Sequence, residues 1–508
     1  MPTANIRSYA LHGVNALAVD IEVHISAGLP AFNIVGMPET AVRESRERVR
    51  SAIINSNFEF PSRRITVNLA PADLPKQGGG FDLPIALGLL IATQQLTLPN
   101  CEELSFCGEL SLVGELRPVK GLLPIAIASR EDNRSLVYPN QYASELSLLK
   151  NIKAYPASSL IAVCAHLKNE IKLESLDTSK LTVVNETTLS GANQSIDLQD
   201  VKGQLIPKKA LEIAAAGGHN LLLNGPPGAG KSMLAKRLTT ILPDLSHDEA
   251  IQVATISSIT GNSRHNILST PLRSPHHTAS SASLVGGGSP PTPGEVSLAH
   301  CGVLFLDELP EFSPKVLEAL REPLENGEIT ISRASQQSTF PANFMLVSAM
   351  NPCPCGYYGN SRCNCTPDRV HKYQRRISGP LLDRIDMQVL VEAPDRSTLL
   401  QTNNKSNSAH GESSLQVKTR VIEARQRQIK RQGKTNANLS SAELETYAPL
   451  DNASKTLLTN AMERLQLSAR GLHKVLRVAL TIADLEGTEC NQNHIKQALN
   501  YRHTSIHK

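Results

Sequence analysis

The chain has 508 residues, of which 40% are hydrophobic and 19% charged, and its formal net charge is +4 at pH 7. This length exceeds what one hydrophobic core normally serves, so about two to four domains are expected. No apolar run approaches the roughly 20 residues that span a membrane, which excludes a membrane-spanning protein. The first residues lack a secretory signal, which predicts a cytoplasmic location. The mildly basic balance is compatible with nucleic-acid binding but is equally common among proteins of other function.

The first 190 residues predict a mixed α/β domain. The sequence predicts strands at 17–26 and 64–69, a turn and a second strand within 28–36, and a helix at 39–55. Arginines and glutamates share one side of that helix, which is typical of a solvated, salt-bridged face, with a nucleic-acid contact as the alternative. A glycine turn follows and opens an apolar helix.

That turn, around Pro75 and Lys76, resembles the active-site turn of Lon-type proteases. Aligned on it, the nucleophilic serine of that family falls at Gly80 and the catalytic lysine at Leu123, with Lys120 nearby. A Ser–Lys dyad needs a hydroxyl and an amine within hydrogen-bonding reach, and neither Gly80 nor Leu123 supplies one. The resemblance therefore implies a Lon-protease or ribosomal-S5-like fold without protease chemistry.

Residues 225–232 form a phosphate-loop pattern, G-x-x-x-x-G-K-S, between an apolar run at 221–223 and a helical run at 233–242. Backbone N–H groups of such a loop surround nucleotide phosphates, Lys231 reaches the β- and γ-phosphates, and the Ser232 hydroxyl is a Mg²⁺ ligand. Because strand and helix flank the loop, an ordinary glycine-rich turn is disfavoured. The predicted nucleotide-binding residues are Gly225, Pro226, Pro227, Gly228, Ala229, Gly230, Lys231 and Ser232.

A second apolar run ends in two adjacent carboxylates, Asp307 and Glu308. A buried parallel strand would bring Asp307 beside Ser232, where it can hold Mg²⁺, and Glu308 could orient or deprotonate the attacking water. Alone, the pair marks only a strand end. Together with the phosphate loop, the Asp-Glu order indicates an ATPase rather than a GTPase or a simple kinase.

Three further residues take roles from a resemblance to AAA+ ATPases. A third apolar run ends at Asn351, where that resemblance implies the sensor-1 contact to the γ-phosphate or the attacking water; the alternative is an asparagine that caps a strand end. Residues 381–386 resemble the segment of magnesium-chelatase and MCM-type ATPases that carries the arginine finger, which implies that Arg384 reaches the nucleotide of the next subunit. The alternative for Arg384 is an ion pair with Asp383 or Asp386. The sensor-2 resemblance of the helix near 470 makes Arg470 a nucleotide contact.

Two insertions resemble the pore elements of the magnesium-chelatase and MCM clade. Residues 281–296 hold a glycine and proline loop that interrupts a helix, like the helix-2 insert, and include Gly286, Gly287 and Gly288. Residues 328–340 predict a β-hairpin like the one before sensor 1, with Arg333 at its tip. In that clade these elements line the pore of a hexamer, so they are candidate DNA contacts. The alternative for Arg333 is a polar turn residue.

Four of the nine cysteines, Cys353, Cys355, Cys363 and Cys365, lie within thirteen residues as two Cys-x-Cys pairs. Four thiolates can surround one tetrahedral Zn²⁺, and such a site would be structural because no ligand position stays open. Free reduced thiols in a loop are the alternative.

The rest of the chain predicts connectors and helices. Residues 175–200 are polar and suit a linker, and 401–414 form a second polar stretch. A basic helix at 417–431 is either a solvated connector or a secondary contact to nucleic acid or a subunit. Residues 440–508 have the periodicity of a helical lid.

Along nearly the whole chain these motifs resemble one family, the bacterial magnesium-chelatase-like ATPases of the YifB/ComM type. The carriers include the 81–87 segment, the histidine-containing segment 274–280, the cysteine cluster and the lid. The implied organisation is an S5/Lon-like domain at 1–190, an AAA+ α/β core at 191–395, and a connector with a helical lid at 396–508.

The resemblance implies a homo-hexameric DNA helicase or translocase that uses ATP and Mg²⁺. In the ComM branch it implies branch migration of recombination intermediates, on single-stranded and branched DNA, during natural transformation. Recombination or competence proteins are then the expected partners, and no membrane is involved. A remodelling chaperone, a magnesium-chelatase motor subunit and a Lon-like protease are the rival functions.

Overall fold

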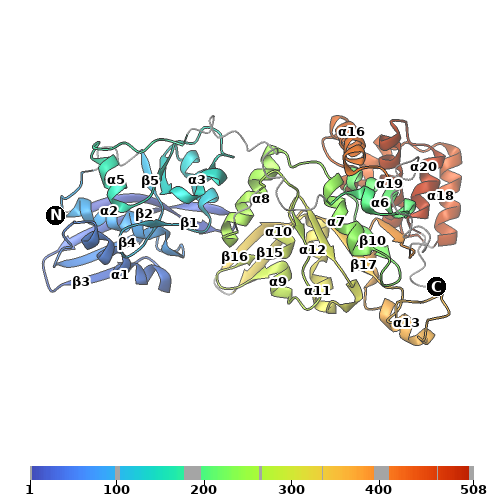
Figure 1. Ribbon diagram of the computed structural model, residues 1–508, viewed down its shortest axis with the longest axis horizontal. Helices are drawn as coiled ribbons and strands as arrows, with labels where there is room; N and C mark the ends of the chain where they lie inside the picture. Colours follow the sequence, from blue (N-terminus) through green and yellow to red (C-terminus); the bar gives the residue numbers. More distant parts are fainter. Residues whose placement is uncertain are drawn as a thin grey trace. The chain divides into compact units, whose positions relative to one another are not determined.

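The computed structural model describes residues 3–97, 103–176, 196–262, 266–333, 336–393, 411–465 and 467–502 (Figure 1). The chain divides into two compact units. Unit 1 consists of Met1–Leu189, Ser246–Leu268 and Ser332–Thr339, and unit 2 consists of Ser190–Leu245, Ser269–Ile331 and Phe340–Lys508. Most of the linker predicted at 175–200, and most of the polar stretch predicted at 401–414, lies outside the described residues. Among the described helices, none combines the length and the apolar character that a membrane span requires.

Unit 1 is built on a four-stranded sheet. Its strands lie in the order β1 (Thr3–His12), β2 (Asn15–Ser26), β4 (Arg64–Ala70) and β3 (Ala31–Val35). The pairs β1–β2 and β2–β4 are antiparallel, whereas β3 runs parallel to β4. Alternate side chains of β2, from Val19 to Ile25, are buried, so the period of two seen in the sequence marks the face that meets the core.

Helices and a smaller sheet complete unit 1. Helices α1 (Thr40–Asn55) and α2 (Asp82–Ala92) pack on each other, and α2 also packs on β1 and β2. The remaining elements are the parallel sheet of β5 (Leu104–Phe106), β8 (Ser135–Pro139) and β9 (Ala154–Ala157), the ribbon of β6 (Glu109–Leu110) and β7 (Leu116–Arg117), and helices α3 (Leu122–Glu131), α4 (Ala143–Leu146) and α5 (Leu160–Leu167). Helix α8 (His247–Thr260) packs against α3 although it follows the phosphate loop in the sequence.

Unit 2 is built on a five-stranded parallel sheet. Its strands lie in the order β11 (Leu272–Arg273), β14 (Val303–Leu306), β17 (Met345–Met350), β10 (Leu221–Asn224) and β18 (Met387–Leu390). Every residue of β10, β14 and β17 is buried. This explains the unbroken apolar runs in the sequence, because helices cover both faces of a parallel sheet.

One hydrophobic core joins this sheet to the C-terminal helices. Its buried side chains come from the strands and from α6 (Leu205–Gly217), α7 (Lys231–Ile241), α16 (Ser414–Gln432) and α19 (Ala469–Glu486), which pack on one another (Figure 1). Helices α17 (Ser441–Tyr447), α18 (Asn452–Leu465) and α20 (Gln492–Asn500) complete this region. The expectation of a multidomain α/β protein with a parallel sheet and a C-terminal helical region is confirmed.

Short elements lie between the strands of the parallel sheet in the sequence. They are α9 (Ser281–Val285), β12 (Gly286–Gly287), β13 (Thr292–Pro293), α10 (Glu295–Leu298), α11 (Pro314–Ala319), α12 (Arg321–Asn326), β15 (Glu328–Arg333), β16 (Gln336–Pro341), α13 (Pro367–Gln374) and α14 (Gly379–Leu382). Strands β12 and β13 form one antiparallel ribbon, and β15 and β16 form another two-stranded sheet. The sequence predicted only a loop within 281–296, whereas the structure also has the β12–β13 ribbon there.

Candidate functional site

The phosphate loop lies where three neighbouring parallel strands end. Strand β17 lies between β10 and β14, so the residues that follow all three strands share one edge of the sheet. In the loop, Gly228 and Gly230 have φ values of +76° and +89°, a conformation that glycine adopts without steric cost. Gly225 packs against the backbone of Val391, where a Cβ would overlap the carbonyl. The pattern of glycines is therefore a consequence of this backbone path.

Lys231 is the first residue of α7, and its side chain is buried. Its Nζ donates to the carbonyls of Gly225 (2.7 Å) and Pro226 (2.9 Å) and to Oδ1 of Asn351 (3.0 Å). Burial lowers the pKa of Lys231, and the carboxylates of Asp307 and Glu308 oppose that shift. The ammonium group is thus held at the loop by oxygen acceptors from two strands' ends.

Asp307 and Glu308 follow β14 directly. The Ser232 hydroxyl donates to Oδ2 of Asp307 at 2.5 Å, and the backbone N–H of Glu308 donates to Oδ1 at 2.9 Å. Glu308 adopts a left-handed backbone with φ of +52°, and about half of its side chain is exposed, 3.5 Å from Nδ1 of His277. The turn therefore directs the two adjacent carboxylates to different partners.

These side chains line one cleft of about 360 Å³. Its lining residues are Pro227, Gly228, Ala229, Gly230, Lys231, Ser232, Met233, Asp307, Glu308, Met350 and Asn351. A cradle of backbone amides, one ammonium group, a hydroxyl–carboxylate pair and a second, exposed carboxylate are the groups that nucleoside-triphosphate hydrolysis requires.

The cysteine loop follows Asn351 and packs on the phosphate loop. The Sγ atoms of Cys353, Cys355, Cys363 and Cys365 all lie within 4.8 Å of one another. The backbone N–H of Tyr357 lowers the pKa of the Cys355 thiol to about 6, which favours the thiolate that a metal binds. At Gly356, between the two pairs, a Cβ would overlap the ring of Pro227. The cluster therefore lies directly beside the nucleotide cradle.

Arg384 and Arg470 lie elsewhere in unit 2. The described residues that line the cleft include neither arginine. Both reach Glu325 on α12: Arg384 is buried and forms a close ion pair with it, while Nη1 of Arg470 lies 3.8 Å from Oε1. Asp386, one of the alternative partners, is instead held by Lys474 at 2.8 Å. Glu325 thus gathers the two arginines on one surface.

Three family descriptions match successive parts of the chain. "Subunit ChlI of Mg-chelatase" matches residues 21–142, "Magnesium chelatase, subunit ChlI" matches 197–399, and "Magnesium chelatase, subunit ChlI C-terminal" matches 411–502. Competence protein ComM of Haemophilus influenzae is 47% identical over 506 residues, covering 99% of this chain and 98% of that protein. The chain belongs to the YifB/ComM-type family of magnesium-chelatase-like proteins. YifB of Salmonella typhimurium and YifB of Escherichia coli are each 46% identical over 505 residues, covering 99% of this chain and 97% of each relative.

This membership confirms the resemblance that the motifs carried. The residues predicted to contact DNA differ in their exposure to solvent. Arg333 is exposed at the end of β15. Gly286 and Gly287 are buried, and a Cβ at Gly286 would overlap the Thr292 carbonyl and Ile331, whereas Gly288 is exposed.

The segment of unit 1 that resembles the Lon active site has no paired hydroxyl and amine at the aligned positions. A Cβ on Gly80 would lie 3.3 Å from Sγ of Cys107, a buried thiol whose pKa burial raises to about 12, so it is not a thiolate nucleophile. Leu123 is buried, and its backbone N–H donates to Ser258 on α8. Lys120 is exposed beside Gly261.

The family's 81–87 segment has a structural role. Asp82 is fully buried at the start of α2 and accepts from Arg48 Nε at 2.7 Å, from the Leu110 N–H at 3.2 Å and from Ser45. Burial raises the pKa of Asp82, and the bonds from Arg48 and Ser45 oppose that shift. This aspartate ties α1, α2 and β6 together.

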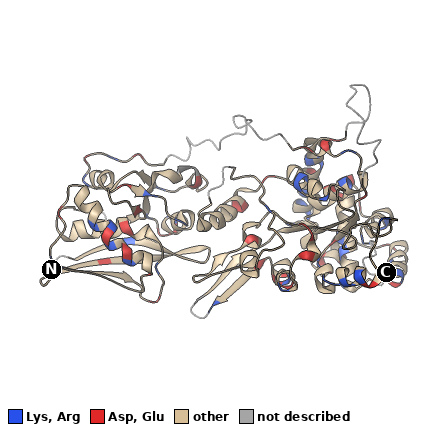
Figure 2. Cartoon of the chain, turned by 60° about the horizontal axis from the view of Figure 1, so that its bottom comes forward, with Lys and Arg blue, Asp and Glu red and all other residues tan. Residues whose placement is uncertain are grey.

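Sequence reasoning missed several partners of the predicted site residues. His277 contacts Glu308, Tyr373 accepts the backbone N–H of Asn351, and Glu325 holds both arginines. The adjacent histidines in 274–280 were the available signal for His277. Tyr373 and Glu325 carried no motif, because their roles depend on elements brought together by the sheet. Basic and acidic residues lie side by side on many of the helices (Figure 2), so charge alone marked none of these positions.

Proposed function

We propose that the protein is an ATP-driven motor that acts on DNA. The observation that carries this proposal is the convergence of Lys231, Ser232, Asp307, Glu308 and Asn351 on one cleft. The family membership supports ATP hydrolysis, and the name of the ComM relative, a competence protein, supports a role with DNA.

In this proposal each side chain has one task. The loop amides and Lys231 bind the β- and γ-phosphates, and Asn351 contacts the γ-phosphate or the attacking water. Ser232 and Asp307 would hold Mg²⁺, which supplies charge neutralisation when bound, and their oxygen donors are of the kind that this ion prefers. Glu308, the exposed carboxylate, orients the water or accepts its proton.

The two arginines and the ring belong to the same proposal. Arg384 acts as the arginine finger and Arg470 as the sensor-2 contact, in a homo-hexamer where each reaches a nucleotide. Their shared position on Glu325, outside the cleft of their own chain, is compatible with action at a subunit boundary. Exchange of Glu325 for phosphoryl oxygens would then accompany assembly.

The motor's substrate is single-stranded and branched DNA in recombination intermediates. Arg333 and the exposed Gly288 lie on the two insertions that we propose face the DNA. Branch migration in natural transformation, with recombination or competence proteins as partners in the cytoplasm, fits the ComM relationship. The division into 1–190, 191–395 and 396–508, with a Lon/S5-like first domain, is part of this proposal.

We also propose that Cys353, Cys355, Cys363 and Cys365 hold one structural Zn²⁺. Four sulfur atoms within 4.8 Å of one another fit a tetrahedral site. Bound zinc would supply rigidity to the loop that packs on Pro227.

The rival functions use the same ATPase centre. A remodelling chaperone would hydrolyse ATP without regard to DNA, and a magnesium-chelatase motor subunit would respond to a porphyrin and Mg²⁺. A Lon-like protease is disfavoured because Gly80 supplies no nucleophile and the nearby thiol of Cys107 stays protonated.

The deciding experiment is ATP hydrolysis by the purified protein with and without single-stranded and forked DNA. We expect DNA to raise the rate, and Glu308→Gln to lower turnover by about a hundredfold or more while ATP still binds. Lys231→Ala, by contrast, should weaken nucleotide binding itself. If the wild-type hydrolyses ATP but ignores every DNA, the ATPase assignment stands and the DNA motor is refuted in favour of a chaperone or a chelatase subunit.

A further inference from the structure

Helix α13, which follows the cysteine loop, is strongly two-sided. Its inner face buries Val370, Tyr373 and Gln374. Its outer face and the residues directly after its end carry exposed cationic and imidazole side chains. These are Arg369, His371, Lys372, Arg375 and Arg376.

Most of these cations form no ion pair with the residues that the structure describes. Arg376 binds Glu311 at 2.9 Å and the carbonyl of Pro310 at 3.2 Å. Within the described residues, Arg369, Lys372 and Arg375 form no ion pair with a carboxylate. Asp368 lies on the same helix but forms no ion pair with them within the described residues, so these exposed cations can bind an external anion.

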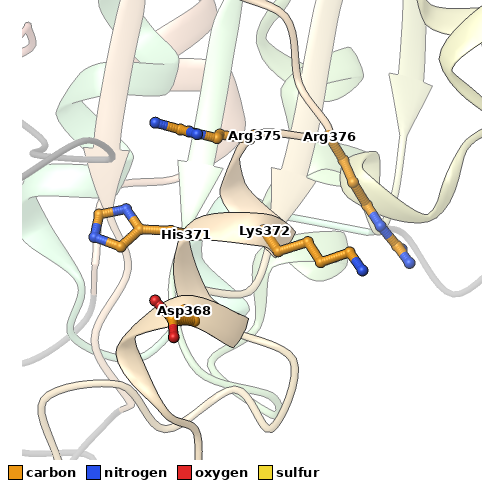
Figure 3. Close-up of a pocket in the computed structure, with 5 residues that line it drawn as sticks. All are labelled: Asp368, His371, Lys372, Arg375 and Arg376. Atoms are coloured by element: carbon orange, nitrogen blue, oxygen red, sulfur yellow. The ribbon is translucent and has the colours of Figure 1, made fainter.

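The side chains border a shallow hollow of about 340 Å³ that is lined by Asp368, His371, Lys372, Arg375 and Arg376. Figure 3 shows them fanned out along the helix, with His371 and Arg375 directed to one side and Lys372 and Arg376 to the other. A single compact anion would need its cations to converge on one point. A fan of charges instead suits an extended chain of phosphates that crosses the helix.

We propose that the outer face of α13 binds the phosphodiester backbone of DNA. This inference rests on the proposed function, and it assigns a second DNA contact to a helix outside the two insertions. Cations that neutralise successive phosphates release counterions, so the contact is independent of base sequence and weakens as salt increases.

The inner face of α13 links this contact to the cleft. Tyr373 accepts the backbone N–H of Asn351, and Nε2 of Gln374 donates to the carbonyl of Pro352 at 3.1 Å. Asn351 in turn accepts from Nζ of Lys231. The helix that would contact DNA is therefore hydrogen-bonded to the residues at the end of β17, beside the nucleotide site. Through this connection, bound DNA could change the rate of ATP hydrolysis.

The test is the salt dependence of binding to labelled single-stranded DNA, measured by fluorescence anisotropy on the full chain. The variant is Lys372→Ala with Arg375→Ala. Its matched control is Lys455→Ala with Arg464→Ala, which removes two exposed cations from α18. Removal of two phosphate contacts should lower the slope of log K against log salt by about 1.4 and the affinity at 0.1 M salt by roughly tenfold to thirtyfold. The control should leave both values unchanged, and Lys372→Arg with Arg375→Lys should retain the wild-type slope.

The outcomes separate this inference from the motor proposal. If the wild-type fails to bind DNA, both are overturned. If the wild-type binds and the α13 variant binds with the same slope, the α13 assignment is overturned and the motor proposal stands. If the variant keeps its DNA affinity but raises the KM for ATP in the absence of DNA, the face serves nucleotide phosphates, which also overturns the assignment. Unchanged urea midpoints establish that the exposed substitutions leave the fold intact.

Discussion

Helices α16 and α13 are both rich in cations, but the cations of α16 form ion pairs with carboxylates of unit 2, whereas most of those on α13 do not. In α16, Arg420 binds the buried Glu212 at 2.6 Å, Arg431 binds the buried Asp484 at 2.6 Å, and Lys418 binds Asp244 at 3.0 Å. In α13, Lys372 and Arg375 face solvent and form no ion pair within the described residues, although Asp368 borders the same hollow. The number of basic residues is therefore a poor guide to function, and the location of their carboxylates is a better one.

The two helices also differ in what their inner faces hold. Helix α16 buries Val417, Val421 and Ala424 in the core of unit 2, and Arg425 donates to the carbonyl of Ala215 on α6. The ion pairs of its cations therefore attach α16, the predicted connector, to the rest of unit 2. The inner face of α13 instead holds the end of the strand that carries Asn351. A structural role for α16 and a binding role for α13 follow from these contacts.

The largest effect expected on this contrast comes from Asp484→Asn. Asp484 is buried and accepts from Arg431 at 2.6 and 2.9 Å and from Asn436 at 2.8 Å. Removal of its charge leaves Arg431 without its counter-ion, so the free energy of unfolding should fall by about 3 kcal/mol. Urea denaturation measures this loss. A variant with wild-type stability but weaker DNA binding would mean that α16, and not α13, carries the functional charge.

Loss of the proposed zinc should loosen the cysteine loop and, through it, α13. Cys353 is fully buried, and α13 begins two residues after Cys365. We expect Cys353→Ser to bind substantially less than one zinc per chain, measured by metal analysis, and to lose most of the DNA stimulation of ATP hydrolysis because the helix is no longer fixed at Asn351. The buried thiol Cys164→Ser, in unit 1, is the control and should keep its zinc. If the zinc-free protein keeps the full DNA stimulation of ATP hydrolysis, the cysteine loop is not needed to hold α13 in place.

A smaller effect is expected from Lys418→Ala. This residue pairs with Asp244, whose side chain is more than half exposed. Exposed pairs contribute about 0 to 1 kcal/mol, so the unfolding free energy should change by no more than that amount. The salt slope of DNA binding should stay at the wild-type value. A lower slope would place DNA on α16 and contradict its role as a connector.

The smallest expected effect is an increase in DNA affinity. Asp368 is the carboxylate in the α13 hollow, and its removal should strengthen DNA binding by about threefold at low salt, since one exposed charge contributes less than about 1 kcal/mol. Anisotropy titration of Asp368→Asn measures this change. Asp451→Asn, an exposed carboxylate before α18, serves as the control. Unchanged or weaker binding by Asp368→Asn would argue against DNA phosphates in the hollow.

The nucleotide cleft was predictable because its signals are local. The glycines of 225–230 follow from the backbone path, and Asp307 and Asn351 each follow a continuous apolar strand. Adjacent parallel strands bring their carboxyl ends together, so three separate motifs predict one edge of one sheet. The cysteine cluster was predictable for a similar reason, since thirteen residues contain all four thiols.

The partners of the charges were not predictable in the same way. Glu325 lies about 60 residues from Arg384 and far from Arg470 in sequence, and only the packing of α12 brings it to both. The sequence of the basic helix at 417–431 left a connector, a nucleic-acid contact and a subunit contact open. Its ion pairs with Asp244, Glu212 and Asp484 favour the connector. The alternation of apolar and basic positions in 369–377 was visible in the sequence. Whether these basic residues form ion pairs depends on where carboxylates lie in the folded chain, and the sequence alone does not show this.

The measurement that tests the central claim most directly is ATP-dependent movement of a branch point. A fluorescently labelled three-way or four-way DNA junction is incubated with the protein and ATP, and release of the labelled strand is followed over time. We predict release by the wild-type with ATP, and binding without release by Glu308→Gln. Hydrolysis of ATP by the wild-type with no strand released, or equal release without ATP, would contradict the account of the protein as an ATP-driven DNA motor.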